Sequence, residues 1–171
     1  GAVGEFGHLD IWINNAGGSP VSAPLVTLDE DEWDATLRLN LTAVWRCTRV
    51  AAATMRDGGR IVNISSLAAT TTMPGSGHYA AAKAGEMALT RCSAIEAAEH
   101  GVRVNAVAPS LAMHPNLEKV TPPGLLEELK AAEAFGRGAE PWEVANVMVF
   151  LASDLSSYMT GEVVPVSSQH A

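Results

Sequence analysis

Short apolar runs rich in β-branched residues alternate along this chain with longer segments in which apolar positions recur at helical spacing. The short runs predict strands at residues 9–13, 60–66, 102–108 and 162–166. The longer segments predict helices over about residues 27–55, 79–100 and 141–152. Strands that alternate with helices of ten or more residues form a parallel sheet with helices on both faces. The pattern therefore predicts an α/β fold built on a doubly wound parallel sheet.

Capping and turn residues set the expected ends of these elements. Thr27 and Glu30 have the spacing of a capping box and are expected to begin the first helix, and residues 57–59, "DGG", to end it. Gly101 stands where a C-terminal glycine cap belongs. Pro165 inside the last apolar run indicates an edge strand or a bulge, because proline cannot donate to a ladder.

The two remaining segments lie before and within this alternation. The pattern of residues 1–7, "GAVGEFG", is typical of the C-terminal end of a helix. A loop is expected over 110–138, with one short helical run at 125–135 that follows a group of helix breakers: Pro115, Pro122, Pro123 and Gly124. A doubly wound sheet that holds a dinucleotide carries a glycine-rich turn after its first strand, and this chain has no such turn. We therefore expect the chain to lack the first strands of its sheet and to be part of a longer protein.

Composition narrows the class of protein. The chain has 171 residues, is 47% hydrophobic and 18% charged, and has room for one domain with a core. The formal net charge is −8 with no run of basic residues, which argues against nucleic acid or an anionic membrane as partner. No apolar run approaches the length needed to span a bilayer. Cys47 and Cys92 lack ligand spacing, so we expect buried reduced thiols in a cytoplasmic protein and no metal site.

One turn of the second long helix places two reactive side chains together. In "YAAAK", Tyr79 precedes Lys83 by four residues, so the two lie on one face of the helix. A neighbouring cation favours the phenolate and lowers the tyrosine pKa, which suits a tyrosine to acid or base chemistry. An ordinary amphipathic helix also explains this pair, and other segments must decide between the two interpretations.

Polar segments follow the first three predicted strands. They are residues 14–17, residues 65–66 and the loop that begins at Pro109. Ligands of open parallel sheets bind at the carboxyl ends of the strands, where these segments are expected to meet.

With these features in place, the chain resembles the short-chain dehydrogenase/reductase family over essentially its whole length. The resemblance rests on five features in the family's order and spacing: "NNAG" at 14–17, Asn40, "NISS" at 63–66, "YAAAK" at 79–83 and "RVNAVAP" at 103–109. Within the family the chain is most similar to the 3-oxoacyl reductase branch.

The resemblance implies a role for each catalytic residue. Tyr79 is the expected acid/base that exchanges a proton with the oxygen of a carbonyl/alcohol pair. Lys83 is expected to lower the Tyr79 pKa and to bind the nicotinamide ribose. Ser66, thirteen residues before Tyr79, matches the serine that orients the substrate oxygen, and Ser65 is the weaker candidate. Asn40 matches the asparagine that holds a water in a proton relay to Lys83.

The resemblance also implies NAD or NADP as cofactor. Its binding is assigned to Asn14, Ala16, Gly17, Tyr79, Lys83, Pro109 and Leu111. Two residues depart from the family pattern, because Ser110 replaces a glycine and His114 stands near a threonine position. The resemblance places the residue that selects NAD or NADP before Gly1, so the preference cannot be predicted.

The expected function is interconversion of a ketone and a secondary alcohol, with a small carbonyl or alcohol molecule as substrate. A 3-oxoacyl or a lipid- or steroid-derived substrate fits the apolar segment 110–138, which we expect to form a lid. A homodimer or homotetramer is expected through the helices that carry Asn40 and Tyr79.

Two alternatives remain open. Nucleotide-sugar epimerases and dehydratases share the Tyr/Lys pair but need a sizeable C-terminal substrate domain, and only about sixty residues follow Pro109. The second alternative is that the chain is a non-catalytic fragment or an assembly subunit of a longer protein.

Overall fold

The computed structural model describes residues 1–19, 21–55, 58–71, 74–121 and 123–169. Two residues of the predictions above lie outside this described part: Asp57 and Pro122. The prediction that "DGG" ends the first helix therefore rests on Asp57 in part and is not tested there. Within the described residues, α3 has its C-cap at Met55.

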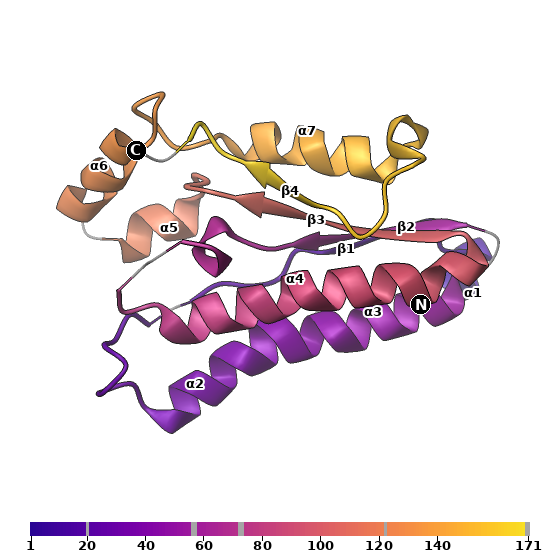
Figure 1. Cartoon of the computed structure of the whole chain (residues 1–171), viewed down its shortest axis with the longest axis horizontal. Coiled ribbons are helices and arrows are strands. Elements are labelled where there is room, and N and C mark those ends of the chain that lie inside the picture. The colour runs from indigo at the N-terminus through magenta and orange to yellow at the C-terminus, as the bar shows by residue number, and fades with distance from the viewer. Residues whose placement is uncertain (20, 56–57, 72–73, 122, 170–171) are drawn as a thin grey trace.

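Four parallel strands form the sheet, in the order β1-β2-β3-β4 (Figure 1). The strands are β1 (Ile11–Asn14), β2 (Gly59–Ile64), β3 (Val102–Pro109) and β4 (Val163–Val166). The register pairs Ile13 with Val62 and Ile61 with Val104, so the strands end close to one another at their carboxyl ends. The predicted doubly wound parallel sheet is confirmed.

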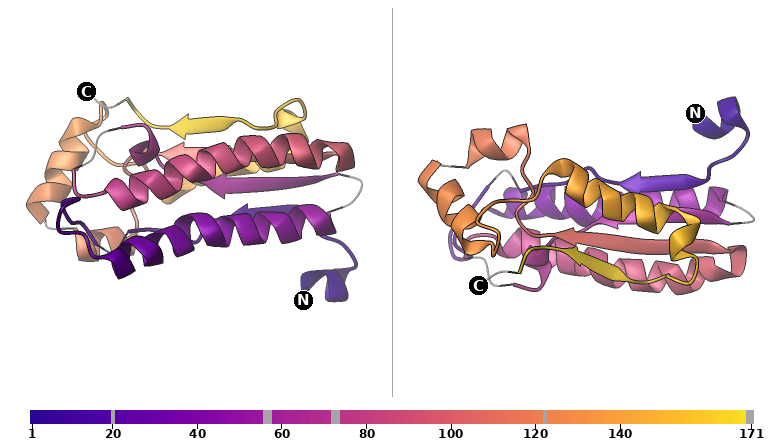
Figure 2. Two further views of the ribbon diagram at one scale, coloured as in Figure 1. Left: turned by 60° about the horizontal axis from the view of Figure 1, so that its bottom comes forward. Right: turned by 90° about the horizontal axis from the view of Figure 1, so that it is seen from above.

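Helices cover both faces of the sheet (Figure 1). One face carries α2 (Glu30–Leu37), the π-helical turn η1 (Arg38–Thr42), α3 (Ala43–Thr54) and α4 (Gly77–Ala97). The other face carries α7 (Pro141–Ala152), which packs against β2 and β3 (Figure 2). The remaining elements are short: α1 (Ala2–Phe6), η2 (Leu67–Ala69), η3 (Ala98–His100), α5 (Pro115–Val120), α6 (Pro123–Ala132) and η4 (Asp154–Ser156).

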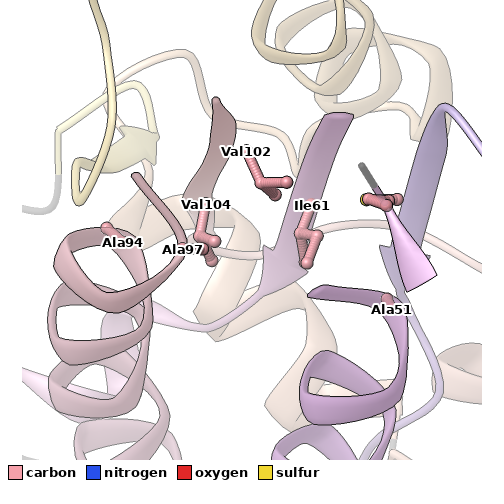
Figure 3. Packing of buried hydrophobic residues seen from close by; sticks show 7 residues of the cluster. Ala51, Ile61, Ala94, Ala97, Val102 and Val104 are labelled. Carbon is pink, nitrogen blue, oxygen red and sulfur yellow. The ribbon is translucent and has the colours of Figure 1, made fainter. Parts of the chain in front are cut away.

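The core has two parts because the sheet is apolar on both faces. Between the sheet and the helices α3 and α4, small and branched side chains interlock (Figure 3): Ala51, Met55, Ile61, Ala94, Ala97, Val102 and Val104. Alanines on both helices let the helix backbones approach the valine and isoleucine side chains of the strands. The second part lies under α7 and contains Val62, Val107, Val144 and Leu151.

The sequence predicted the C-terminal cap at Gly101 and the edge strand correctly. Gly101 has a left-handed φ of 68° and its N–H donates to Ala98 O, so a glycine is needed there. Gly7, with φ of 84°, ends α1 in the same way. Pro165 lies in β4, and β4 is an edge strand of the sheet formed by the described residues.

The predicted start of the first helix was wrong. Asp29, and not Thr27, is the N-cap, because the Asp29 side chain accepts a hydrogen bond of 2.9 Å from Asp31 N. The Thr27 hydroxyl instead donates to Pro24 O within the preceding turn. The single helix predicted over 27–55 is also interrupted, because η1 separates α2 from α3.

Candidate functional site

The candidate site lies where the carboxyl ends of β1, β2 and β3 meet the N-terminal half of α4. The segment after β1 carries Ala16 and Gly17, η2 after β2 follows Ser66, and α4 carries Tyr79 and Lys83. α5 and α6 extend beyond the strands at this same end of the molecule (Figure 1).

Tyr79 and Lys83 lie on one face of α4, as their spacing predicts. The Lys83 Nζ is 5.9 Å from the centre of the Tyr79 ring. Lys83 is 3% exposed, whereas Tyr79 keeps part of its surface accessible. A buried ammonium therefore lies beneath a tyrosine that remains within reach of a small molecule.

Two acceptors fix the Lys83 ammonium. Its Nζ donates to Ile64 O at the end of β2, at 2.5 Å, and to Glu86 Oε2, at 2.7 Å. Glu86 is on the same helix and is completely buried. Burial raises the Glu86 pKa to about 7, although the neighbouring Lys83 charge and its hydrogen bond lower it.

The expected decrease of the Tyr79 pKa is not found, and this expectation is corrected. Burial raises the pKa of the Tyr79 phenol above its ordinary value, a hydrogen bond from the Ser66 side chain lowers it, and the Glu86 charge raises it. The physical reason is that the phenol loses hydration and that Lys83 brings a carboxylate with it. A lysine at i+4 lowers a tyrosine pKa only where its own charge is not offset.

The structure separates the two candidate serines. Ser66 is the one whose side chain interacts with the Tyr79 phenol and lowers its pKa, and its Oγ accepts from Ala68 N at the start of η2. Ser65 is buried and its hydroxyl donates to Lys83 O, at 3.2 Å. Ser65 thus holds the backbone of α4 against β2, and Ser66 faces the tyrosine.

Asn40 lies in the π-helical turn η1 and is completely buried. Its Nδ2 donates to Thr36 O and Gly18 O, and its Oδ1 accepts from Gly18 N at 2.8 Å. π-Helical turns occur often at functional sites, because they turn one side chain out of the regular ladder. Asn40 therefore joins the helix to the loop after β1. Its role in a water relay stays a prediction.

Gly17 is where this loop comes closest to Asn40 and Lys83. A methyl group added at Gly17 would lie 2.8 Å from Asn40 Oδ1 and 3.4 Å from Lys83 Nζ. Only a residue without a side chain allows this approach. Ala16 and Gly17 are both exposed, so their backbone is accessible to a ligand.

Asn14 is part of a buried amide network. Its Nδ2 donates to Thr48 Oγ1 and Asn63 Oδ1, and its Oδ1 accepts from Trp12 Nε1. Asn63 in turn donates to Thr90 Oγ1 on α4, at 2.9 Å. The Asn14 side chain thus ties β1 to β2 and to the helices beneath them, and its contact with a cofactor stays a prediction.

Pro109 is buried at the end of β3, and Leu111 follows it at the start of the segment 110–138. Leu111 N donates to Glu133 Oε1, and Leu111 O accepts from Ala139 N. The Glu133 carboxylate also accepts from Ser168 Oγ, at 2.9 Å. Sequence reasoning missed Glu133, because nothing in its helical run distinguishes it from the exposed glutamates nearby.

One further expectation, the burial of both cysteines, is corrected, and two histidines have structural positions. His78 is completely buried, and its Nε2 is 3.1 Å from Ser19 Oγ. Cys92 is exposed and Cys47 partly so, although both are free as expected. His114 caps α5, because its Nδ1 accepts from Leu117 N.

The sequence matches, over residues 1–168, the family model described as enoyl-(acyl carrier protein) reductase. The chain belongs to the short-chain dehydrogenase/reductase family, which confirms the resemblance inferred from the motifs.

The chain is also similar to individual proteins and to a solved structure. It is 56% identical to (5R,7aS)-5-hydroxy-7a-methyl-1-oxo-2,3,5,6,7,7a-hexahydro-1H-indene-carboxyl-CoA reductase of Mycobacterium tuberculosis, over 97% of this chain and 64% of that protein. It is 40% identical to 3-oxoacyl-[acyl-carrier-protein] reductase of Thermotoga maritima, over 96% of this chain and 67% of that protein. The crystal structure of a short chain dehydrogenase from Mycobacterium smegmatis matches with a TM-score of 0.82 and 51% identity, over 99% of this chain and 62% of that one. The chain thus spans somewhat under two thirds of the length of the first of these relatives and of the solved structure.

None of the helices formed by the described residues combines the length and the apolar character that a membrane-spanning segment needs. Within the same residues, no group of three or more His, Cys, Asp or Glu side chains is placed to hold a metal ion.

Proposed function

We propose that the whole protein is an NAD(P)-dependent oxidoreductase that interconverts a ketone and a secondary alcohol, with Tyr79 as the residue that exchanges the proton. The observation that carries the proposal is the constellation at the end of β2, where the Lys83 ammonium is buried 5.9 Å from the Tyr79 ring and the Ser66 side chain acts on the same phenol. Members of the family named above are reductases and a dehydrogenase, not epimerases, which favours redox chemistry over the nucleotide-sugar alternative.

The residues present fit a nicotinamide cofactor. The Lys83 ammonium has three N–H donors. Two of them donate to Ile64 O and Glu86 Oε2, and the proposal assigns the third to a ribose hydroxyl. Gly17 keeps the loop after β1 free of a side chain beside that ammonium. When bound, the cofactor supplies the hydride, and this chain supplies the proton and the orientation.

In the direction of reduction, the Ser66 hydroxyl would orient the substrate carbonyl and Tyr79 would donate its phenolic proton to the carbonyl oxygen. In the direction of oxidation, the Tyr79 oxygen would accept the proton of the alcohol. The phenolate formed or consumed in each turnover lies near the Lys83 charge, which stabilises it electrostatically. Asn40 holds the loop at Gly18 in place for this exchange.

The remaining cofactor contacts are assigned to backbone groups. Ala16 and Gly17 approach the ribose, and Pro109 and Leu111 approach the nicotinamide. Leu111 N is bonded to Glu133 Oε1 in this structure, so a contact of that N–H with a carboxamide must replace this bond. The choice between NAD and NADP is not assigned to any residue of this chain.

The substrate is proposed to be an apolar ketone carried on an acyl thioester, of the 3-oxoacyl or fused-ring class. The support is twofold: the names of two relatives describe such thioesters, and α5 and α6 within the segment 110–138 lie at the carboxyl ends of the strands. Leu125 and Phe135 in that segment are exposed apolar side chains, as a lid over an apolar substrate requires.

A homodimer or homotetramer through α3 and α4 is proposed as the assembly. The two helices lie side by side on one face of the sheet (Figure 2). Trp45, Val50 and Ile95 leave apolar surface exposed on them. The cytoplasmic location stays a prediction, supported by two cysteines that form no disulfide.

The test uses the full-length protein and follows the absorbance of the reduced nicotinamide. We expect turnover of 3-oxoacyl thioesters or fused-ring ketone thioesters with one of the two cofactors. Tyr79→Phe keeps the ring but removes the proton, and it is expected to lower kcat by about a thousandfold or more. The exposed Tyr158→Phe is the matched control and is expected to retain wild-type turnover. Unchanged turnover of Tyr79→Phe refutes the assignment.

A further inference from the structure

A carboxylate without a role in the mechanism above lies next to the reacting groups. Glu86 follows Lys83 by three residues on α4, is completely buried, and accepts a hydrogen bond of 2.7 Å from Lys83 Nζ with its Oε2. Its second oxygen, Oε1, has no hydrogen-bond partner among the described residues. A buried carboxylate with one unsatisfied oxygen is costly, so it needs a reason beyond packing.

The position of Glu86 changes how strongly the Lys83 charge stabilises the Tyr79 phenolate. A lone ammonium 5.9 Å from the ring would stabilise the phenolate strongly in this buried setting. An ionised Glu86 next to that ammonium opposes the effect, and its charge does raise the pKa of Tyr79. Lys83 and Glu86 thus act on Tyr79 as a pair whose net charge depends on the protonation of Glu86.

We propose that Glu86 is a positioning residue of the active site, which holds the Lys83 ammonium in place and limits how strongly the ammonium charge acts on the Tyr79 hydroxyl. The inference rests on the proposed function, because Tyr79 must exchange the proton for Glu86 to matter to the rate. With Glu86 ionised, Tyr79 stays a neutral proton donor over a wider pH range. With Glu86 protonated, the Lys83 charge acts on Tyr79 without opposition.

Other charges near α4 do not replace Glu86 in this role. Arg103, on β3 against which α4 packs, donates to Ser153 O, Ser156 Oγ and Met159 O, and so is held at the far end of the sheet. The remaining titratable groups on elements packed against α4 lie at least partly exposed: Glu30, Asp31, Glu32, Asp34, Arg38, Arg46, Cys47, Arg49, Glu99 and His100. His78, on α4 itself, is buried and turned to Ser19.

The experiment titrates Tyr79 directly in the full-length protein. The ultraviolet absorbance of tyrosinate is followed against pH with and without Tyr79→Phe, and the difference isolates this one phenol. In Glu86→Gln, which keeps the shape and an acceptor for Lys83 but removes the charge, we expect the Tyr79 midpoint to fall by about one pH unit. The pH at which kcat/KM for alcohol oxidation reaches half its maximum is expected to fall by the same amount.

Glu96→Gln is the matched control, because it removes the same charge from an exposed position on the same helix. It is expected to leave both midpoints unchanged. If Glu86→Gln does not fold, Glu86→Asp keeps the charge but withdraws it from Lys83, and a smaller fall of the Tyr79 midpoint is then expected.

The two proposals fail in different ways. A folded Glu86→Gln, or in its place Glu86→Asp, with an unmoved Tyr79 midpoint overturns the role of Glu86 and leaves the proposed function intact. Turnover that survives Tyr79→Phe overturns the proposed function itself, whatever the titration gives.

Discussion

At the scale of single residues, the site depends as much on a missing side chain as on those present. Gly17 lets the loop after β1 lie against Asn40 and Lys83, and a Cβ there would stand 2.8 Å from Asn40 Oδ1. Asn40 cannot give way easily, because its amide is already bonded to Thr36 and Gly18. An added methyl must therefore displace the loop or the asparagine.

We expect Gly17→Ala to lower kcat/KM by about tenfold to a hundredfold, since a displacement of about 1 Å in a positioning group has effects of this size. Steady-state kinetics on the full-length protein measure the loss, and thermal unfolding checks that the fold persists. Gly4→Ala is the control, because nothing lies within 4 Å of a Cβ at that glycine. Equal kinetics for the two variants contradict the close approach described for Gly17.

The identities of the reacting residues could be predicted from the sequence because their spacing is local. Tyr79 and Lys83 are one helical turn apart, and Ser66 precedes Tyr79 by a fixed interval. Glu86 carried a comparable signal, three residues after Lys83 on the same helix, but its meaning depends on burial. Burial of that face comes from the sheet and from α3, which no local pattern specifies. For this reason the direction of the Tyr79 pKa was predicted wrongly.

At the scale of elements, the alternation of strands and helices was predictable and their boundaries were less so. Strand β3 and helix α7 match the predicted ranges closely, because strong apolar runs and a proline mark them. The π-helical turn η1 was not predictable, since it depends on Asn40 reaching Gly18 in a distant loop. The start of α2 was misplaced because two residues with capping ability, Thr27 and Asp29, lie close together.

The two candidate caps of α2 give a direct test. Asp29→Ala removes the acceptor for Asp31 N and is expected to lower the free energy of unfolding by about 1 kcal/mol. Thr27→Ala removes only a hydroxyl bonded to Pro24 O and is expected to change it by less than about 0.5 kcal/mol. Chemical denaturation of both variants measures the difference. A larger loss for Thr27→Ala restores the capping box predicted from the sequence.

At the scale of the whole molecule, the exposed apolar surface on α3 and α4 bears on assembly. Ile95 is 77% exposed and Val50 is 60% exposed, so each helix presents apolar surface that a second copy of the chain can cover. We expect Ile95→Glu in the full-length protein to reduce the assembly to monomers, as measured by light scattering. Val26→Glu, at an exposed site before α2, is the control and should leave the mass unchanged. A wild-type protein that is already monomeric contradicts the proposed interface.

The buried Lys83–Glu86 pair also makes the stability of the whole molecule depend on pH. The Glu86 pKa is raised from 4.5 to about 7 on folding, mainly by burial, so the folded state binds this proton more tightly than the unfolded state. The stabilisation associated with that proton is fully present below pH 4.5 and is lost as the pH rises through about 7.

We therefore expect the titration of Glu86 to lower the free energy of unfolding by about 2–3 kcal/mol between pH 4.5 and about 8. Glu86→Gln binds no proton there, so its unfolding free energy should fall less over this interval than that of the wild type. Denaturant titrations of both proteins at a series of pH values measure the difference, with Glu96→Gln expected to follow the wild type. Parallel curves for wild type and Glu86→Gln would mean that the carboxylate titrates alike in both states, because only a pKa that changes on folding gives stability a slope with pH.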